Sequence, residues 1–112
     1  MADNFWEAAD RLVAESKLII DRPKGSAHPK YTGYIYPVDY GYLDNTTSMD
    51  QGGIDVWRGT AGNSVDAIVV TLDMYKKDSE IKILLGCNQE EKQLIMDVHN
   101  EGPMNGILIS RE

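Results

Sequence analysis

The apolar positions near the N-terminus repeat with the period of a helix. Five of them fall on one face at helical spacing: Phe5, Ala8, Ala9, Leu12 and Val13. Asn4 is suited to cap the first turn, and Glu7, three residues later, completes a capping box. The pattern predicts a helix over residues 4–16. Trp6 lies off this stripe and is expected either to contact a partner or to cover the edge of the core.

The rest of the chain has mostly the pattern of strands. Runs rich in β-branched residues predict strands over residues 17–21, 54–58, 65–74, 80–85 and 104–110. Residues 75–79 form a short connection, so the strands on either side of it are expected to be antiparallel neighbours. In the second of these, Ile81, Ile83 and Leu85 alternate with Glu80, Lys82 and Leu84, which is typical of a half-buried strand.

A second helix is predicted over residues 88–99. Asn88 and Glu91 form another capping box, and Gly102-Pro103 stops the helix. Leu94, Ile95 and Val98 are expected to face inward. His99, at the end of this helix, is expected to interact with the last carbonyl groups.

Composition restricts the class of protein. With 112 residues, of which 42% are hydrophobic and 26% charged, the chain is expected to form one domain over residues 1–112. A net charge of −7 argues against a nucleic-acid partner. Cys87 is the only cysteine, which excludes a disulfide framework and a thiolate zinc site. Neither a secretory signal pattern nor a run of about 20 apolar residues is present, so we expect a cytoplasmic protein with no membrane partner.

Residues 36–56 carry the candidate chemistry. Four aspartates occur there without any Lys, Arg or Glu: Asp39, Asp44, Asp50 and Asp55. Tyr36, Tyr40 and Tyr42 alternate at the start of the segment, and glycines interrupt it. Carboxylates on a turn-rich segment suit a hard cation such as Mg²⁺. The other interpretation is a solvated loop with Asp and Asn placed for turns.

The preceding loop, residues 22–30, is cationic. It carries Arg22, Lys24 and Lys30 among two prolines and a glycine. It is either a solvated connection or an anion-binding loop whose lysine ammonium groups face phosphate oxygens.

Both segments resemble the soluble (family I) inorganic pyrophosphatases. The signature-like residues are Tyr36-Pro37, Tyr40-Gly41-Tyr42, Asp50 and Ile54-Asp55-Val56. The loop matches in the order and spacing of Asp21, Pro23, Gly25, Ser26, Lys30 and Tyr31. The resemblance implies an α+β, mainly β fold: a small OB-like, pyrophosphatase-type β-barrel with two packed helices. It also implies Mg²⁺-dependent hydrolysis of pyrophosphate or a related phosphoanhydride, with Mn²⁺ as another possible ion, and it leaves a homo-oligomer possible.

The resemblance assigns roles to individual residues. Asp50 and Asp55 would bind metal and, with Tyr40, form the catalytic set. Lys30 and Lys24 would bind phosphate, Tyr40 would donate a hydrogen bond to it, and Asp21 would hold metal-bound water or Lys30.

Two alignments compete for the family's later acids and the lysine that follows them. In the one we favour, Asp73 and Asp78 are further metal ligands, but Glu80 then stands at the lysine position. In the other, Lys82 is that lysine, and Glu80 and Tyr75 stand at the acid positions. A charged hairpin turn with surface acids is the alternative to both.

Several family positions differ. Gly52 stands where the family has the Asp that acts as general base, and Thr32 replaces a Glu. The hairpin that carries a phosphate-binding arginine is missing between Tyr31 and Tyr36, and the helix over residues 88–99 lacks a Tyr-Lys pair. We therefore expect either a weakened hydrolase or a non-catalytic phosphate- or nucleotide-binding module. A third hypothesis is an interaction protein that uses the acidic rim and an exposed Trp6 or Trp57.

Overall fold

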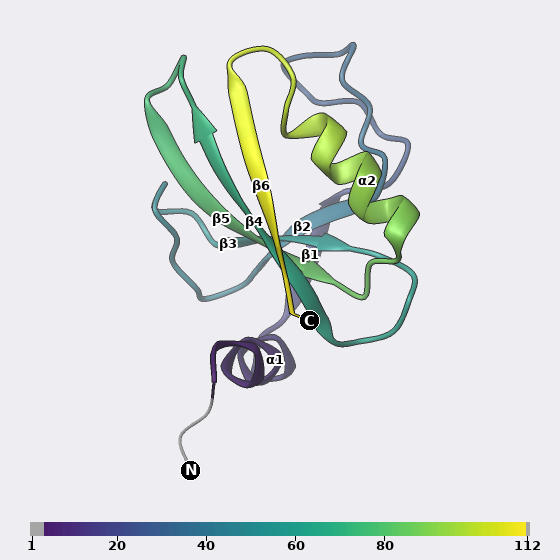
Figure 1. Cartoon of the computed structure of the whole chain (residues 1–112), viewed down its shortest axis with the longest axis vertical. Coiled ribbons are helices and arrows are strands. Elements are labelled where there is room, and N and C mark those ends of the chain that lie inside the picture. The colour runs from purple at the N-terminus through teal and green to yellow at the C-terminus, as the bar shows by residue number, and fades with distance from the viewer. Residues whose placement is uncertain (1–3, 112) are drawn as a thin grey trace.

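A computed structural model describes residues 4–111 (Figure 1). The elements, in chain order, are α1 (Phe5–Glu15), β1 (Leu18–Arg22), β2 (Asp39–Leu43), β3 (Ile54–Arg58), β4 (Val65–Asp73), β5 (Asp78–Leu85), α2 (Gln89–Val98) and β6 (Met104–Ser110). Both predicted helices and all five predicted strands are present, with ends that differ by two residues at most. The strand β2 is not among the predicted ones, because its sequence, Asp-Tyr-Gly-Tyr-Leu, has no β-branched residue and contains a glycine.

The strands form one six-stranded mixed sheet in the order β1-β2-β3-β5-β4-β6. Only β3 and β5 are parallel, and every other neighbouring pair is antiparallel. The fold is therefore mainly β with two helices, as expected. The pairings do not close into a ring, and β1 and β6 are the edges of the sheet.

The predicted hairpin of β4 and β5 is confirmed. Val65 pairs with Leu85 at one end and Asp73 with Asp78 at the other. The turn closes through a hydrogen bond from the Lys77 amide to the Asp73 carbonyl oxygen at 2.7 Å, with Lys77 in the left-handed region at φ 58°. This hairpin brings Glu80 and Lys82 beside β3.

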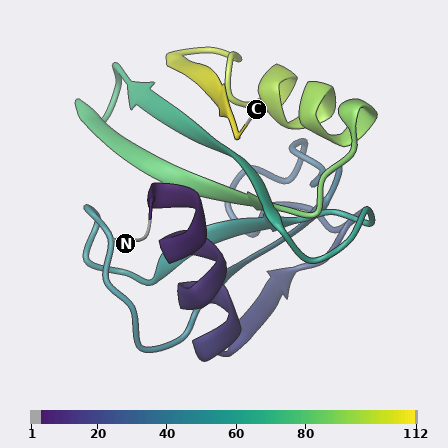
Figure 2. The ribbon, with the colours of Figure 1, turned by 60° about the horizontal axis from the view of Figure 1, so that its bottom comes forward.

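The two helices lie on opposite faces of the sheet (Figures 1 and 2). On the α1 face, a core cluster contains Ala9, Leu43, Val56, Val65, Ile83 and Leu85. On the α2 face, a second cluster contains Tyr36, Val38, Trp57, Ala67, Val69, Leu84, Cys87 and Ile95. Cys87 is a buried free thiol, and burial raises its pKa to about 12, which is consistent with a structural role.

The half-buried pattern predicted for β5 is wrong. Leu84 is fully buried and Lys82 is only 6% exposed, whereas Ile81 is 45% exposed. The reason is that the C-terminal half of β5 is covered on both faces, since Ile83, Leu84 and Leu85 belong to the two core clusters, whereas Ile81 belongs to neither. The alternation of residue types does not report this change along the strand.

Both helices begin with the predicted capping boxes, at Asn4–Glu7 and Asn88–Glu91. Most of the predicted inward positions are confirmed, namely Ala9, Leu12 and Val13 in α1 and Ile95 and Val98 in α2, and one position in each helix is wrong. Trp6 packs on the core cluster of the α1 face, as expected if it covers the edge of the core, and Phe5 is exposed. In α2, Met96 and Val98 pack inward with Ile95, and Leu94 is exposed.

Trp57 is fully buried, which removes it from any exposed interaction surface. Within residues 4–111, neither helix is long and apolar enough to cross a bilayer.

Candidate functional site

A cavity of about 740 Å³ opens on the α2 face of the sheet. Its walls come from the β1–β2 loop, from β2, β3 and β5, from the β4–β5 turn and from the segment after α2. Asp50, Asp55, Glu80 and Lys82 line it together with Tyr36, Tyr40 and Trp57. The acidic segment and the predicted hairpin therefore meet in one concavity.

Three carboxylates gather in this cavity. Asp50, Asp55 and Glu80 each offer one oxygen, and these oxygens all lie within 4.8 Å of one another. Asp55 and Glu80 come from the parallel neighbours β3 and β5, and Asp50 comes from the turn before β3. Parallel pairing of two strands that are distant in sequence is what brings these acids together.

The carboxylate of Asp50 is fixed by its own turn. Its Oδ1 accepts hydrogen bonds from Ser48 Oγ at 2.7 Å and from the Gly52 amide at 2.9 Å. The Ser48 bond and then the Gly52 bond lower the pKa of Asp50, because both favour the charged form. Gln51, at the tip of the turn, has φ 71°. Asp50 is therefore held ionised at a defined place beside the cavity.

Lys82 is the buried cation of this cluster. Its Nζ lies 2.8 Å from Asp55 Oδ2 and 3.6 Å from Glu80 Oε1, and it donates to the Tyr40 hydroxyl oxygen at 2.8 Å. Burial raises the pKa of Glu80, Lys82 opposes this, and the charges of Asp55 and Asp50 add to the rise. The cluster is thus a dense group of like charges partly balanced by one lysine.

Tyr40 connects the acidic cluster to an aromatic wall. Its ring lies 4.5 Å from that of Trp57 and 5.4 Å from that of Tyr36, centroid to centroid. Burial, and then the charge of Asp55, raise the pKa of Tyr40 well above its usual value. Its hydroxyl group therefore stays protonated at neutral pH and can donate a hydrogen bond.

Cationic side chains lie elsewhere on the cavity wall. Arg22 comes from the end of β1, and Lys76 comes from the β4–β5 turn. Burial lowers the pKa of His28, and the charges of Arg22, Lys76 and Lys30 lower it further, so these cations surround the same histidine. The cavity combines a carboxylate cluster with a separate cationic region.

His28 organises the loop that carries these groups. Its Nδ1 accepts hydrogen bonds from the amides of Lys30 and Tyr31, at 3.0 and 3.1 Å. Its ring also contacts the rings of Tyr31, Tyr34 and Tyr36. A bridge between Ala27 and Ile35 closes the loop. His28 is thus a structural residue of the cavity wall.

The predicted phosphate lysines do not line the cavity. Lys30 places its Nζ 5.7 Å from the centre of the Tyr31 ring, and Lys24 contributes its charge near Glu91. Arg22, the first residue of the cationic segment 22–30, does line the cavity.

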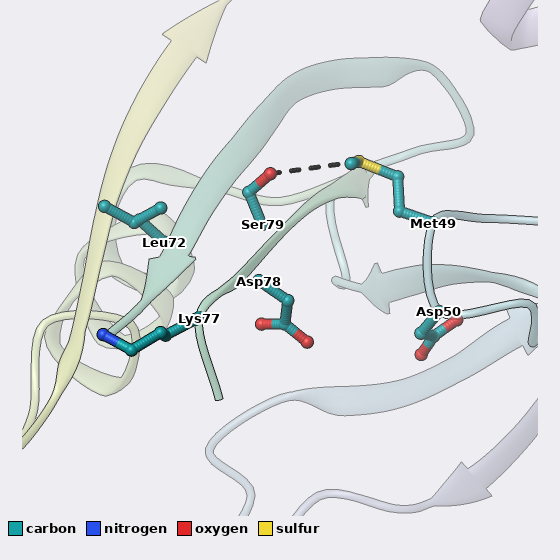
Figure 3. A pocket seen from close by; sticks show the side chains of 6 residues that line it. All are labelled: Met49, Asp50, Leu72, Lys77, Asp78 and Ser79. Atoms are coloured by element: carbon teal, nitrogen blue, oxygen red, sulfur yellow. Dashed lines mark hydrogen bonds between the residues drawn. The ribbon is translucent and has the colours of Figure 1, made fainter. Parts of the chain in front are cut away.

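Asp73, Asp78 and Asp21 lie outside the carboxylate group. Asp73 lines the cavity, but its Oδ1 accepts the amides of Tyr75 and Lys76, at 2.9 and 3.0 Å, and so caps the turn. Asp78 faces a smaller pocket of about 330 Å³, in which Asp50 lies across from it (Figure 3). Asp21 lines the cavity 3.5 Å from Arg22.

Glu80 and Lys82 of β5 both line the cavity, and they are the acid and the lysine of the second alignment considered above. Positions i and i+2 of a strand project from the same face, so their spacing in the sequence predicts that they lie together. The buried contact between Trp57 and His99 had no sequence signal.

The three carboxylates could hold a divalent cation. In an octahedral Mg²⁺ site the metal–oxygen bonds are about 2.1 Å, so neighbouring ligand oxygens lie about 3 Å apart and opposite ones about 4.2 Å apart. The three carboxylate oxygens lie within 4.8 Å of one another, so the side chains would move closer together to bind one ion. All-oxygen donors also match the preference of Mg²⁺ and Mn²⁺.

Comparison with known proteins gives no independent assignment. No protein-family model matches the chain, and a search of curated proteins returns no match either. The functional argument therefore rests on the cavity and its residues.

Proposed function

We propose that this protein is a divalent-metal-dependent hydrolase of pyrophosphate or a related phosphoanhydride, on a shortened pyrophosphatase-type β-barrel. The observation that carries the proposal is the carboxylate group of Asp50, Asp55 and Glu80 beside Lys82 and Tyr40 in one cavity. The resemblance described above includes two of these acids and Tyr40, and the third acid, Glu80, stands at an acid position in the second alignment.

The chemistry requires that phosphate charge be neutralised and that a water molecule be activated. A Mg²⁺ ion held by Asp50, Asp55 and Glu80 would supply both. The Tyr40 hydroxyl, whose oxygen accepts a hydrogen bond from Lys82, would donate one to a phosphate oxygen, and Lys82 would offset the negative charge that develops on the leaving phosphate. Arg22 and Lys76 would bind the end of the substrate that lies away from the acidic cluster.

The reaction is expected to be slow. Gly52, at the position of the family's general base, offers only its backbone amide, which is bound to Asp50. A positioned general base contributes roughly 10² to 10⁴ in rate. This observation also favours a second candidate function, a phosphate- or nucleotide-binding module that retains the cavity and lacks turnover.

Phosphate release tests the first function against the second. The substrates are pyrophosphate, triphosphate and nucleoside di- and triphosphates, each measured with and without Mg²⁺ or Mn²⁺. We expect metal-dependent release that Asp55→Asn abolishes and that Asp97→Asn, on the exposed side of α2, leaves unchanged. Thermal stabilisation by one of these ligands without release would instead support the binding module.

A further inference from the structure

The buried position of Lys82 bears on how many metal ions the site can hold. The side chain of Lys82 is 7% exposed, and its ammonium group contacts Asp55 and Tyr40 at 2.8 Å each and Glu80 at 3.6 Å. A buried cation is retained only with close anionic or hydrogen-bonding partners, and Lys82 has all three. It therefore lies among the carboxylates that a metal ion would use.

The charges of the cluster can be counted. Asp50, Asp55 and Glu80 contribute three negative charges when ionised, and Lys82 contributes one positive charge. The balance is two negative charges, which one divalent cation neutralises. A second divalent ion would leave a net positive charge in a partly buried site, where uncompensated charge is costly.

The other carboxylates of the cavity do not offer a second centre. These are Asp21, Asp73 and Glu101. Asp21 is paired with Arg22, Asp73 is bound by the amides of its own turn, and Glu101 is an exposed residue after α2. Across residues 4–111, one group of three metal-ligating side chains is found, and it is the one beside Lys82. A pair of metal ions about 3.5–4 Å apart would have to share these same three acids.

We infer that Lys82 acts as a tethered cation in the place of a second metal ion, so that this site takes a single divalent cation. The inference rests on the proposed function, because it concerns the same carboxylates. It goes further because it states how many metal ions bind per chain and that the charge of Lys82 takes the place of a second ion.

The first test counts ions in the native chain without substrate. Titration with Mn²⁺, followed by electron paramagnetic resonance and by calorimetry, should give one ion per chain, and Asp55→Asn should abolish the binding. Two ions per chain that both depend on Asp55 would overturn the inference while leaving the hydrolase proposal intact. No binding at all would overturn both.

The second test removes the tethered charge. Lys82→Met keeps the aliphatic stem and leaves three negative charges, so Mn²⁺ should bind roughly tenfold tighter or a second ion should enter, because close charges interact strongly at low effective dielectric. Lys17→Met makes the same change in net charge at an exposed site before β1 and should leave Mn²⁺ binding unchanged.

Unchanged affinity and stoichiometry in a folded Lys82→Met chain would overturn the inference. If that variant does not fold, the ion count in the native chain decides alone. Phosphate release is measured separately, so failure of the hydrolase proposal is distinguishable from failure of the one-ion stoichiometry.

Discussion

The indole Nε1–H of Trp57 donates a hydrogen bond to Nε2 of His99 at 3.0 Å, inside the core of the α2 face. The two rings meet edge to face with centroids 5.6 Å apart. Trp57 belongs to β3 and His99 follows the last residue of α2, so this bond ties the sheet to the helix behind the cavity. It requires an unprotonated Nε2, which corrects the expectation that the His99 side chain would bind carbonyl groups of its own helix.

Stability should fall in mild acid because of His99. Burial, and then the charge of Lys82, lower the pKa of His99 to about 3 from its usual 6.5. Between these values the unfolded chain binds a proton that the folded chain refuses. His99 therefore causes no loss of stability above pH 6.5. Between pH 6.5 and about 3, each pH unit lowers the free energy of unfolding by up to about 1.4 kcal/mol. Urea denaturation at pH 7, 6 and 5 measures the slope.

A matched pair of variants isolates this contribution. His99→Gln keeps an acceptor for Trp57 but cannot titrate, so the loss of stability between pH 7 and 5 should be smaller than in the native chain. His28→Gln removes the other histidine, which lies in the loop before β2, and should keep most of the native slope. Equal slopes for His99→Gln and the native chain would contradict the assignment.

Arg22 should matter more to anion binding than either predicted lysine. Arg22→Ala is expected to weaken pyrophosphate binding about tenfold, since a charge-assisted hydrogen bond contributes about 1.5–3 kcal/mol. Lys24→Ala and Lys30→Ala each remove one positive charge from the loop between β1 and β2. Neither side chain lines the cavity, so each change should reduce the affinity much less. Calorimetry at fixed ionic strength gives the three values, and a larger effect at Lys30 would place the anion elsewhere.

Gly52→Asp should raise both metal affinity and hydrolysis. Gly52 is not among the residues with left-handed φ, so an Asp can adopt its backbone conformation. A Cβ there would lie 3.3 Å from Asp50 Oδ1, which requires a shift of a few tenths of an ångström. A restored base should increase metal-dependent phosphate release by roughly 10² or more.

Gly52→Asn is the control for that variant, because it has the same shape without the charge. If Gly52→Asp folds, binds Mg²⁺ more tightly and releases no more phosphate than Gly52→Asn, the missing base does not limit the reaction. The binding module would then be the better proposal.

Gly41→Ala should destabilise the sheet. Gly41 lies in β2 opposite Ile20, and a Cβ there would overlap the backbone of Ile19 and Ile20. Overpacking against backbone that cannot move freely should reduce the free energy of unfolding by about 2–3 kcal/mol. Gly33→Ala, where a Cβ meets nothing within 4 Å, should stay within about 0.5 kcal/mol of native. Urea denaturation compares the two.

Local pattern was sufficient for most elements. The capping boxes at Asn4 and Asn88 and the short turn before Asp78 were predicted from neighbouring residues, and the structure confirms them. Their hydrogen bonds join residues three to five positions apart, so the sequence contains all the information they need. The same holds for β3, whose predicted bounds, residues 54–58, agree with the structure.

The candidate site is different, because its parts come from separate stretches. The sequence by itself determined that Asp50, Asp55, Glu80 and Lys82 exist and lie on or beside strands. Only the tertiary structure decided that β5 runs parallel to β3, which puts Lys82 against Asp55 and leaves Asp73 as a turn cap. The physical reason is that strand order and burial on both faces depend on packing between distant segments, and no local periodicity encodes them.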